Sequence, residues 1–264
     1  MKPNKHIQRD GNATKIFDAR SQANDYRHLS RILKSGMNVL DVGCGTGSIS
    51  KDIAAIVGEN GKVTGIDNTE NFILSGQSTY ESVANLKLIN IDLFDYNPEE
   101  KYDLIVSARV LQWLSNPKEA LLKMKSLLKP NGQISILDYN HKAIEWIPSP
   151  PESMQEFYQT FLNWRKDAGM NNEIADDLAS LLKEVGFHSI EVINSDEFYN
   201  KDVLDYKSKI GIWSKVAGSS QMVEEGYLDN NLRLKAIEEY NNWIEKEVVS
   251  MTMKLNEVRG KVSK

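Results

Sequence analysis

The chain of 264 residues is poor in the residues that build covalent frameworks and membrane segments. Its single cysteine, Cys44, excludes an intrachain disulfide framework and a cysteine-rich zinc site. No run approaches the roughly 18 to 20 apolar residues that a membrane-spanning helix needs. Residues 1–10 are polar and lack the apolar core of a signal peptide. We therefore expect a protein of a reducing compartment, most simply the cytoplasm, without a membrane partner.

A surplus of positive charge is also absent. The net charge is −5, because 37 Asp and Glu outnumber 32 Lys and Arg. Proteins that neutralise phosphates usually carry a basic surplus, so nucleic acid is a disfavoured partner. Hydrophobic residues make up 41% and charged residues 26%, which excludes general disorder. The length favours one large domain or a domain plus a modest insertion. We expect a monomer or a homodimer.

Short apolar strands alternate with helical patterns over the middle of the chain, and this alternation predicts a parallel sheet covered by helices on both faces. The expected strands are residues 37–41, 62–67, 87–91, 103–107, 133–138, 188–192 and 248–258. The expected helices are residues 48–57, 71–84, 117–128 and 176–185, with a turn at 129–132. The alternation breaks twice, at 141–175 and at 200–246, and we expect helical insertions there.

The sharpest motif is the run from Asp41 to Gly47, which reads Asp-Val-Gly-Cys-Gly-Thr-Gly after a buried strand. Glycines let the backbone turn sharply and let a ligand lie against it, and open α/β sheets bind ligands at such strand ends. A dinucleotide fingerprint places its third glycine at the position that Ser48 occupies. No Lys follows the glycines, as a phosphate-binding loop would require. The loop therefore predicts a ligand site of another kind.

Asp41-x-Gly43-x-Gly45-x-Gly47 resembles the S-adenosylmethionine site of class I methyltransferases. Residues 37–140 follow the strand and helix order of that family, and 176–198 and 248–258 fit its closing elements. The resemblance implies an α/β, Rossmann-like, seven-stranded sheet with helices on both faces and the final strand antiparallel. It also implies a single domain, made of an N-terminal helical cap (1–35), a cofactor-binding core (36–140), helical lid insertions (141–175 and 200–246) and a C-terminal part of the core (176–199 and 247–264).

The resemblance also assigns roles in cofactor binding. The loop would contribute Asp41, Gly43, Cys44, Gly45 and Gly47. Asp67, at the tip of the second strand, would accept both ribose hydroxyl protons, with Asn68 near the adenine. Asp92 would accept from the adenine amino group while the Leu93 N–H reaches a ring nitrogen. Backbone carbonyls near Ser107 and Ala108 would border the methionine part, and Arg20 or Tyr26 would either meet the cofactor carboxylate or serve as scaffold.

The acceptor side follows the fourth strand. Leu111-Gln112-Trp113-Leu114 looks like a variant found in small-molecule enzymes, the methyltransferase-11 and trans-aconitate-methyltransferase group. Arg109 would bind a substrate anion, or else pair with a helix. His141 is the best placed of the four histidines to act as a base, with Tyr139 beside it. The expected substrate-binding residues are Arg109, Gln112, Trp113, Trp146, Trp164 and Trp213, although the lid aromatics could equally form core.

Competing interpretations differ in plausibility. Amino-methylating DNA enzymes are disfavoured because their motif after the fourth strand is missing, and cytosine-C5 enzymes because no cysteine lies on a substrate-facing loop. Divalent-metal O-methyltransferases need a carboxylate cluster that is also missing, so we expect no metal. An NAD-dependent reductase is disfavoured by the glycine spacing. Two alternatives stay open: a methyltransferase of tRNA, rRNA or protein, and a cofactor-binding protein without turnover.

Overall fold

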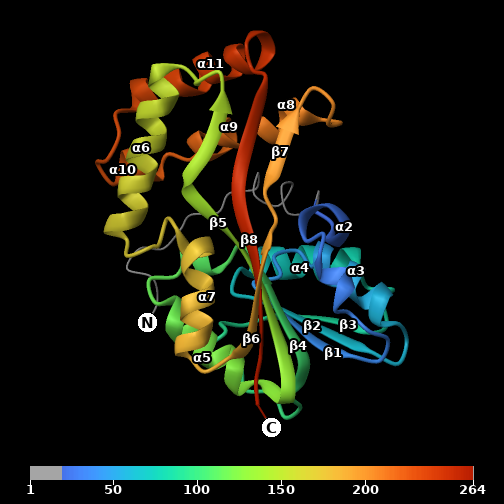
Figure 1. Ribbon diagram of the computed structural model, residues 1–264. Coiled ribbons are helices and arrows are strands. Elements are labelled where there is room, and N and C mark those ends of the chain that lie inside the picture. Colours follow the sequence, from blue (N-terminus) through green and yellow to red (C-terminus); the bar gives the residue numbers. More distant parts are fainter. Residues whose placement is uncertain (1–19, 264) are drawn as a thin grey trace.

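An eight-stranded sheet forms the centre of the computed structural model, which describes residues 20–263 (Figure 1). The strands are β1 (Asn38–Val42), β2 (Lys62–Asp67), β3 (Leu86–Asn90), β4 (Tyr102–Ala108), β5 (Leu128–Ile147), β6 (His188–Asn194), β7 (Glu197–Asn200) and β8 (Ser250–Lys261). Their order is β3-β2-β1-β4-β5-β8-β6, and β7 also pairs with β8. The first five strands are parallel, whereas β8 is antiparallel to β5, β6 and β7.

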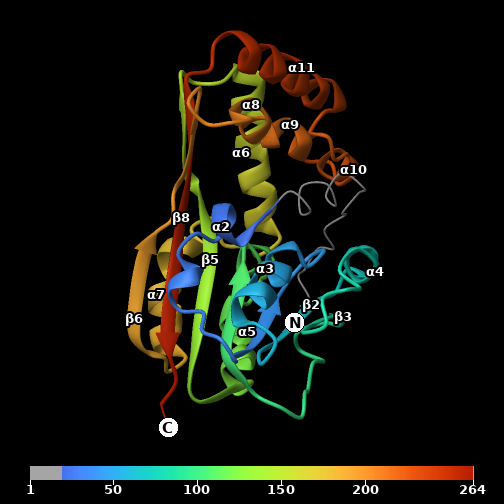
Figure 2. The same cartoon turned by 90° about the vertical axis from the view of Figure 1, so that its right-hand side faces the viewer.

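The helices divide between the two faces of the sheet and a layer above it. They are α2 (Gln22–Asp25), α3 (Ser48–Val57), α4 (Glu70–Thr79), α5 (Pro117–Ser126), α6 (Glu152–Asp167), α7 (Ile174–Glu184), α8 (Tyr206–Ile210), α9 (Ile212–Ala217), α10 (Gln221–Glu224) and α11 (Asn230–Lys246), with short 3-10 turns η1 (Leu29–Arg31) and η2 (Leu111–Trp113). Figure 2 shows α6, α8, α9 and α11 against the upper parts of β5 and β8. These helices therefore lie beside the extended ends of β5 and β8.

Two apolar cores hold this arrangement. One joins α3, α6, the helices from α8 to α11 and inward residues of the sheet, and it includes Val39, Ile53 and Phe157. The other packs α5 and α7 on the opposite face, against sheet residues such as Leu40 and Ile105. Alternate residues of β1, such as Val39 and Leu40, point to opposite faces and enter different cores. Burial on both faces is what the predicted parallel sheet requires.

The sequence predicts most of this sheet, but β5 differs. The bounds of α3 and β2 are as expected, and α4 ends at Thr79 rather than at residue 84. Residues 141–147, expected to open a helical insertion, instead continue β5 to Ile147, and the expected turn at 129–132 lies within the same strand, with Asn131 at φ 62°. The sheet has eight strands rather than seven because β6 and β7 are separate strands along β8.

The extension of β5 contains a bulge at residues 141–144, where the pairing with β8 shifts register between Asn140 and Glu145. The Asn140 side chain stabilises it, since its Oδ1 accepts from the backbone N–H groups of Lys142 at 2.9 Å and Ala143 at 3.2 Å. The N–H of His141 donates to the Asn172 carbonyl at 2.7 Å instead of to a neighbouring strand. Bulges commonly re-aim a side chain next to active sites, and this one turns His141 into the interior.

Candidate active site

The glycine loop joins β1 to α3 in a conformation that requires glycine. Gly43, Gly45 and Gly47 have φ values of 72°, 59° and 82°, a region that other residues rarely adopt. A Cβ atom on Gly43 would lie 2.3 Å from a methyl carbon of Val110, and one on Gly47 would lie 2.8 Å from a methyl carbon of Leu88. The Val110 contact brings the loop against the segment that follows β4.

Of the other residues of the motif, Asp41 and Thr46 are buried and Cys44 is half-buried. Asp41 is buried, and its Oδ2 accepts from the Ser50 hydroxyl at 2.6 Å, which ties β1 to α3. Burial raises the pKa of Asp41 to about 6. Cys44 packs closely against Gly65, because a Cβ atom on Gly65 would lie 2.8 Å from the sulfur of Cys44. The buried Thr46 hydroxyl has no hydrogen-bond partner in the described part of the chain, and such an orphan in a glycine loop suits a ligand.

Asp67 lies at the tip of β2, where its carboxylate bridges two backbone segments. Oδ2 accepts from the N–H of Gly45 at 3.1 Å, and Oδ1 accepts from the N–H of Thr69 at 2.8 Å. A carboxylate has about four lone-pair sites, so this anchoring is compatible with the expected ribose contact. Asn68, beside it, is exposed. The loop glycines, the Thr46 hydroxyl and Asp67 therefore fit the nucleoside part of S-adenosylmethionine.

The next two strands end near the same edge of the sheet. Asp92 follows β3 half-buried, and its Oδ1 accepts from the Phe94 N–H at 2.9 Å; Leu93 packs partly into the core beside α5. Ser107 is buried and its hydroxyl donates to the Val42 carbonyl at 2.9 Å, while Ala108 is half-buried. The structure thus brings these four residues to the expected edge, although the Ser107 side chain serves to join β4 to β1.

Of the two N-terminal candidates, Tyr26 is placed as scaffold. Its side chain is 1% exposed, and its hydroxyl donates to the Ser135 carbonyl at 2.7 Å within the sheet. Of the two alternatives for Tyr26, this placement favours the scaffold over a contact with the cofactor carboxylate. Arg20 lies near the charges of Arg109, Asp25 and Glu197; burial, followed by Arg109, lowers its pKa. Residues 1–19, the first part of the expected cap, lie outside the described residues.

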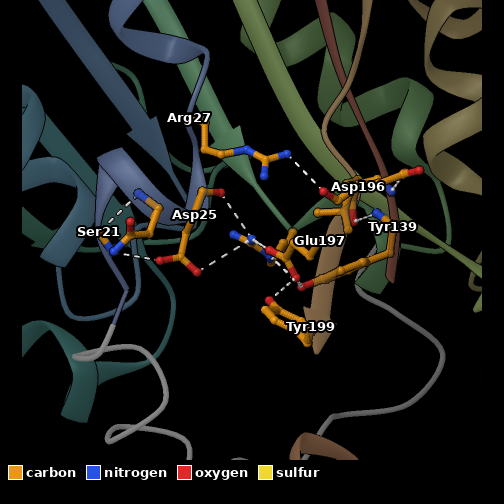
Figure 3. Close-up of polar contacts among 11 residues, drawn as sticks. Ser21, Asp25, Arg27, Tyr139, Asp196, Glu197 and Tyr199 are labelled. Atoms are coloured by element: carbon orange, nitrogen blue, oxygen red, sulfur yellow. Dashed lines mark hydrogen bonds and ion pairs between the residues drawn. The ribbon is translucent and has the colours of Figure 1, made fainter. Parts of the chain in front are cut away.

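Arg109, expected to bind a substrate anion, lies in a buried ion-pair cluster. Figure 3 labels three of its neighbours, Asp25, Tyr139 and Glu197. Its Nη2 pairs with Glu197 on β7 and lies 3.8 Å from Asp25 Oδ1, and its Nε donates to the Tyr139 hydroxyl at 2.7 Å. Burial alone would raise the Glu197 pKa, but Arg109 and the Tyr199 hydroxyl hold that pKa below its usual range. Two carboxylates already neutralise Arg109, so the alternative of an internal pairing describes it better than the substrate contact.

Gln112 and His141 form the best-defined polar pair of the site. Gln112 Nε2 donates to the Arg109 carbonyl at 3.1 Å, which leaves Gln112 Oε1 facing His141 Nε2 at 2.5 Å. An amide oxygen only accepts, so this orientation assigns the imidazole proton to Nε2. His141 Nδ1 is then an acceptor, and it is buried without a partner in the described part of the chain. Burial, followed by the charge of Arg165, holds the pKa of His141 well below its usual range.

Arg165 is a site residue that sequence reasoning missed. It is fully buried on α6, where its Nε donates to Asn172 Oδ1 at 2.7 Å and its Nη2 donates to the Gln112 carbonyl at 2.8 Å. Its Cζ lies 4.7 Å from the ring centroid of Trp113 and 5.4 Å from that of Phe161. The sequence feature that could have identified Arg165 is its position on the apolar face of α6, four residues after Phe161.

Aromatic side chains enclose His141. The ring centroids of Tyr139, Phe161 and Trp213 lie 5.3, 6.0 and 6.0 Å from that of the imidazole. Trp146 is further out, donates to the Tyr240 hydroxyl at 3.0 Å, and lies 6.4 Å from Trp213. Trp164 is buried, its Nε1 donates to Glu225 at 2.9 Å, and its ring stacks on Phe161 with the centroids 6.2 Å apart.

Two further features concern residues 20–263 only. No group of three or more His, Cys, Asp and Glu side chains is placed there to hold a metal ion. None of the helices in this range is long and apolar enough to cross a membrane.

Known proteins resemble the chain in part. Malonyl-[acyl-carrier protein] O-methyltransferase 1 of Ilyobacter polytropus is 33% identical over 110 residues, 42% of this chain and 41% of that protein. Demethylmenaquinone methyltransferase of Staphylococcus carnosus is 25% identical over 175 residues, 61% of this chain and 71% of that protein. The first relative is thus matched over less than half of its length.

Solved structures share the fold at low identity. Phosphoethanolamine N-methyltransferase 2 of Haemonchus contortus, solved with phosphomonomethylethanolamine and S-adenosylhomocysteine, has a TM-score of 0.58 and 16% identity, with 91% of this chain and 52% of that chain covered. Residues 33–207, more than half of the chain, match a family described as "Methyltransferase domain". Together with the strand order and the glycine loop, this match shows that the chain belongs to the class I, S-adenosylmethionine-dependent methyltransferase family.

Proposed function

We propose that the protein transfers the methyl group of S-adenosylmethionine to a small-molecule acceptor. The observation that carries the proposal is the meeting of two groups of residues at the carboxyl end of β4. The loop that fits the cofactor touches Val110, and Gln112, two residues later, holds His141 in a defined tautomer. A cofactor site and a base are therefore joined by one short segment.

The chemistry needs little covalent participation from the protein. S-adenosylmethionine, when bound, supplies a methyl group already activated on a sulfonium. The protein aligns the acceptor with that methyl and excludes water, and such positioning contributes on the order of 7–11 kcal/mol. Cofactor-binding roles for Asp41, Gly43, Cys44, Gly45, Gly47, Asp67, Asn68, Asp92, Leu93, Ser107, Ala108 and Arg20 remain part of this proposal.

His141 is the proposed general base for an O–H or N–H acceptor. As the acceptor atom forms its bond to the methyl carbon, its proton passes to His141 Nδ1, and the methyl–sulfur bond breaks. The products are the methylated acceptor, S-adenosylhomocysteine and a protonated imidazole. Because burial lowers the pKa of His141, the imidazole is neutral at neutral pH and its Nδ1 lone pair is ready to accept.

A small molecule is favoured over a macromolecule as the acceptor. His141 lies among buried aromatic rings, and small-ligand sites are lined predominantly by hydrophobic and aromatic side chains. The net charge of −5 disfavours an RNA substrate. Two relatives are named for methylation of malonyl-[acyl-carrier protein] and of demethylmenaquinone; neither name fixes the acceptor atom here. We further propose that α6 and α8 to α11 form the lid over this enclosure.

Calorimetry with S-adenosylhomocysteine tests the cofactor half of the proposal. We expect the wild type to bind it and Asp67→Ala to bind it more weakly by roughly 1.5–3 kcal/mol, as when a charged hydrogen-bond acceptor is removed. Asp95→Ala, an exposed aspartate on a neighbouring loop, is the matched control and should bind normally. Unchanged affinity in Asp67→Ala would refute the ribose role, and binding of NADH in place of the nucleoside would favour the reductase.

A further inference from the structure

Buried polar atoms without partners gather around one phenylalanine. In the described residues seven side-chain nitrogen or oxygen atoms are buried and make no hydrogen bond. Three of these atoms, His141 Nδ1, Arg165 Nη1 and Trp213 Nε1, belong to side chains that surround Phe161. The Phe161 ring centroid lies 6.0 Å from that of His141, 5.7 Å from that of Trp213 and 5.4 Å from Arg165 Cζ. Such atoms are few in native proteins, and a cluster of them calls for an explanation.

The charge of Arg165 is the least compensated feature of this cluster. Its two hydrogen-bond acceptors, the Asn172 side-chain oxygen and the Gln112 carbonyl, are both neutral. Burial lowers the pKa of Arg165 to about 10, and the charge of Asp138 opposes this shift only in part. The oxygens of the Asp138 carboxylate accept from the N–H groups of Gln112 and Tyr139 instead of from Arg165. A buried guanidinium without a bonded anion is costly, so the fold maintains a cation where a ligand would be expected to neutralise it.

The unpartnered atoms supply complementary chemistry. Arg165 Nη1 and Trp213 Nε1 are both donors, and a guanidinium is suited to a carboxylate or phosphate. His141 Nδ1 is an acceptor, suited to a hydroxyl or amine proton. The aromatic rings between them suit an apolar or flat body. One molecule with an anionic end and a protonated nucleophile satisfies all of these groups together.

We propose that the acceptor substrate is a small anion, whose carboxylate or phosphate group binds Arg165 and Trp213 while its nucleophile faces His141. This inference rests on the proposed function, and it names the substrate class of the same site. It moves the anion contact from Arg109, which Glu197 and Asp25 neutralise, to Arg165, which has no ion-pair partner in the described part of the chain.

The test titrates four probes into the protein saturated with S-adenosylhomocysteine: benzoate, phenyl phosphate, inorganic phosphate and uncharged benzamide. Benzoate and benzamide share a ring and differ in charge, and the phosphate probes distinguish the two kinds of anion. We expect at least one aromatic anion to bind about tenfold or more tightly than benzamide, as for a charge-assisted hydrogen bond. Arg165→Met should remove that preference, and Arg165→Lys should retain part of it.

Two further variants separate recognition from folding. Trp213→Phe removes one N–H and keeps a ring, so anion affinity should fall by about three- to tenfold. Arg31→Met, at an exposed arginine of η1, is the control and should change nothing. Equal binding of benzoate and benzamide by the wild type, or a preference that survives in Arg165→Met and Trp213→Phe, would overturn the anion site. Absence of S-adenosylhomocysteine binding by the wild type would instead contradict the proposed function.

Discussion

Two buried arginines, Arg109 and Arg165, lie on either side of Gln112 and differ in how the fold treats their charge. Arg109 is paired with Glu197 and lies near Asp25, and it also binds Tyr139. Arg165 has neutral acceptors and two aromatic faces. The comparison indicates that Arg109 links α2, β4, β5 and β7, whereas Arg165 is available to bind the anionic group of the proposed substrate. The burial of an arginine does not distinguish a structural role from a binding role, whereas the charge of its hydrogen-bond partners does.

The largest expected difference between the two arginines is in stability. Arg109→Met leaves two buried carboxylates, Asp25 and Glu197, near the single charge of Arg20. We expect the free energy of unfolding to fall by about 3–5 kcal/mol, because the cation that pairs with Glu197 is lost. Arg165→Met leaves only neutral acceptors unpaired, for a loss of about 1–3 kcal/mol. Urea unfolding measures both values.

A double variant tests the cause of that loss. Glu197→Gln in the Arg109→Met background removes one of the unpaired charges, so it should recover part of the lost stability. Equal losses in the two single variants, or no recovery in the double variant, would contradict the assignment of Arg109 to an internal ion-pair cluster.

Asp41 provides a pH-dependent test near the glycine loop. Its pKa is about 6 in the folded protein against the ordinary value of 3.8, so between these pH values the folded state holds more protons than the unfolded chain. The contribution of this group to the free energy of unfolding is therefore complete below the lower pKa and falls as the pH rises through about 6, by on the order of 3 kcal/mol. Asp41→Asn should flatten the stability profile by that amount between pH about 4 and about 7; an unaltered slope would refute the burial of its charge.

The smallest expected effect concerns the tautomer of His141. Nitrogen-15 NMR spectra should show the proton on Nε2, and the imidazole should stay neutral at pH 6.5, the usual histidine value. Gln112→Leu removes the acceptor that fixes this tautomer, so a mixture of the two forms should appear. A wild type that is already a mixture, or that is half protonated at this pH, would contradict the positioning role of Gln112.

The sequence predicts the cofactor half of the molecule well because local rules act there. Positive φ angles need glycine at Gly43, Gly45 and Gly47, and buried parallel strands read as apolar runs. The acceptor half depends on long-range pairing, which no local rule specifies. The extension of β5 pairs Glu145–Ile147 with Ser250–Thr252 of β8. The available sequence signal was the alternation of apolar and polar residues in β8, with Met251, Met253 and Leu255 buried.

The partners of individual side chains could not be predicted, for the same reason. Arg109 and Arg165 look alike in a sequence, and only tertiary contacts give Arg109 its two carboxylates. Tyr26 likewise looked available until the sheet placed Ser135 beside its hydroxyl. His141 was singled out from its place after the fifth strand, but its orientation depends on the Asn140 bulge and on Gln112.

A crystal structure with S-adenosylhomocysteine tests the central claim most directly. We expect the nucleoside against the loop from Gly43 to Gly47 with its ribose on Asp67, and the sulfur directed toward His141 Nδ1 and Arg165 Nη1. A nucleoside bound elsewhere, or a sulfur separated from His141 and Arg165 by the sheet, would contradict it.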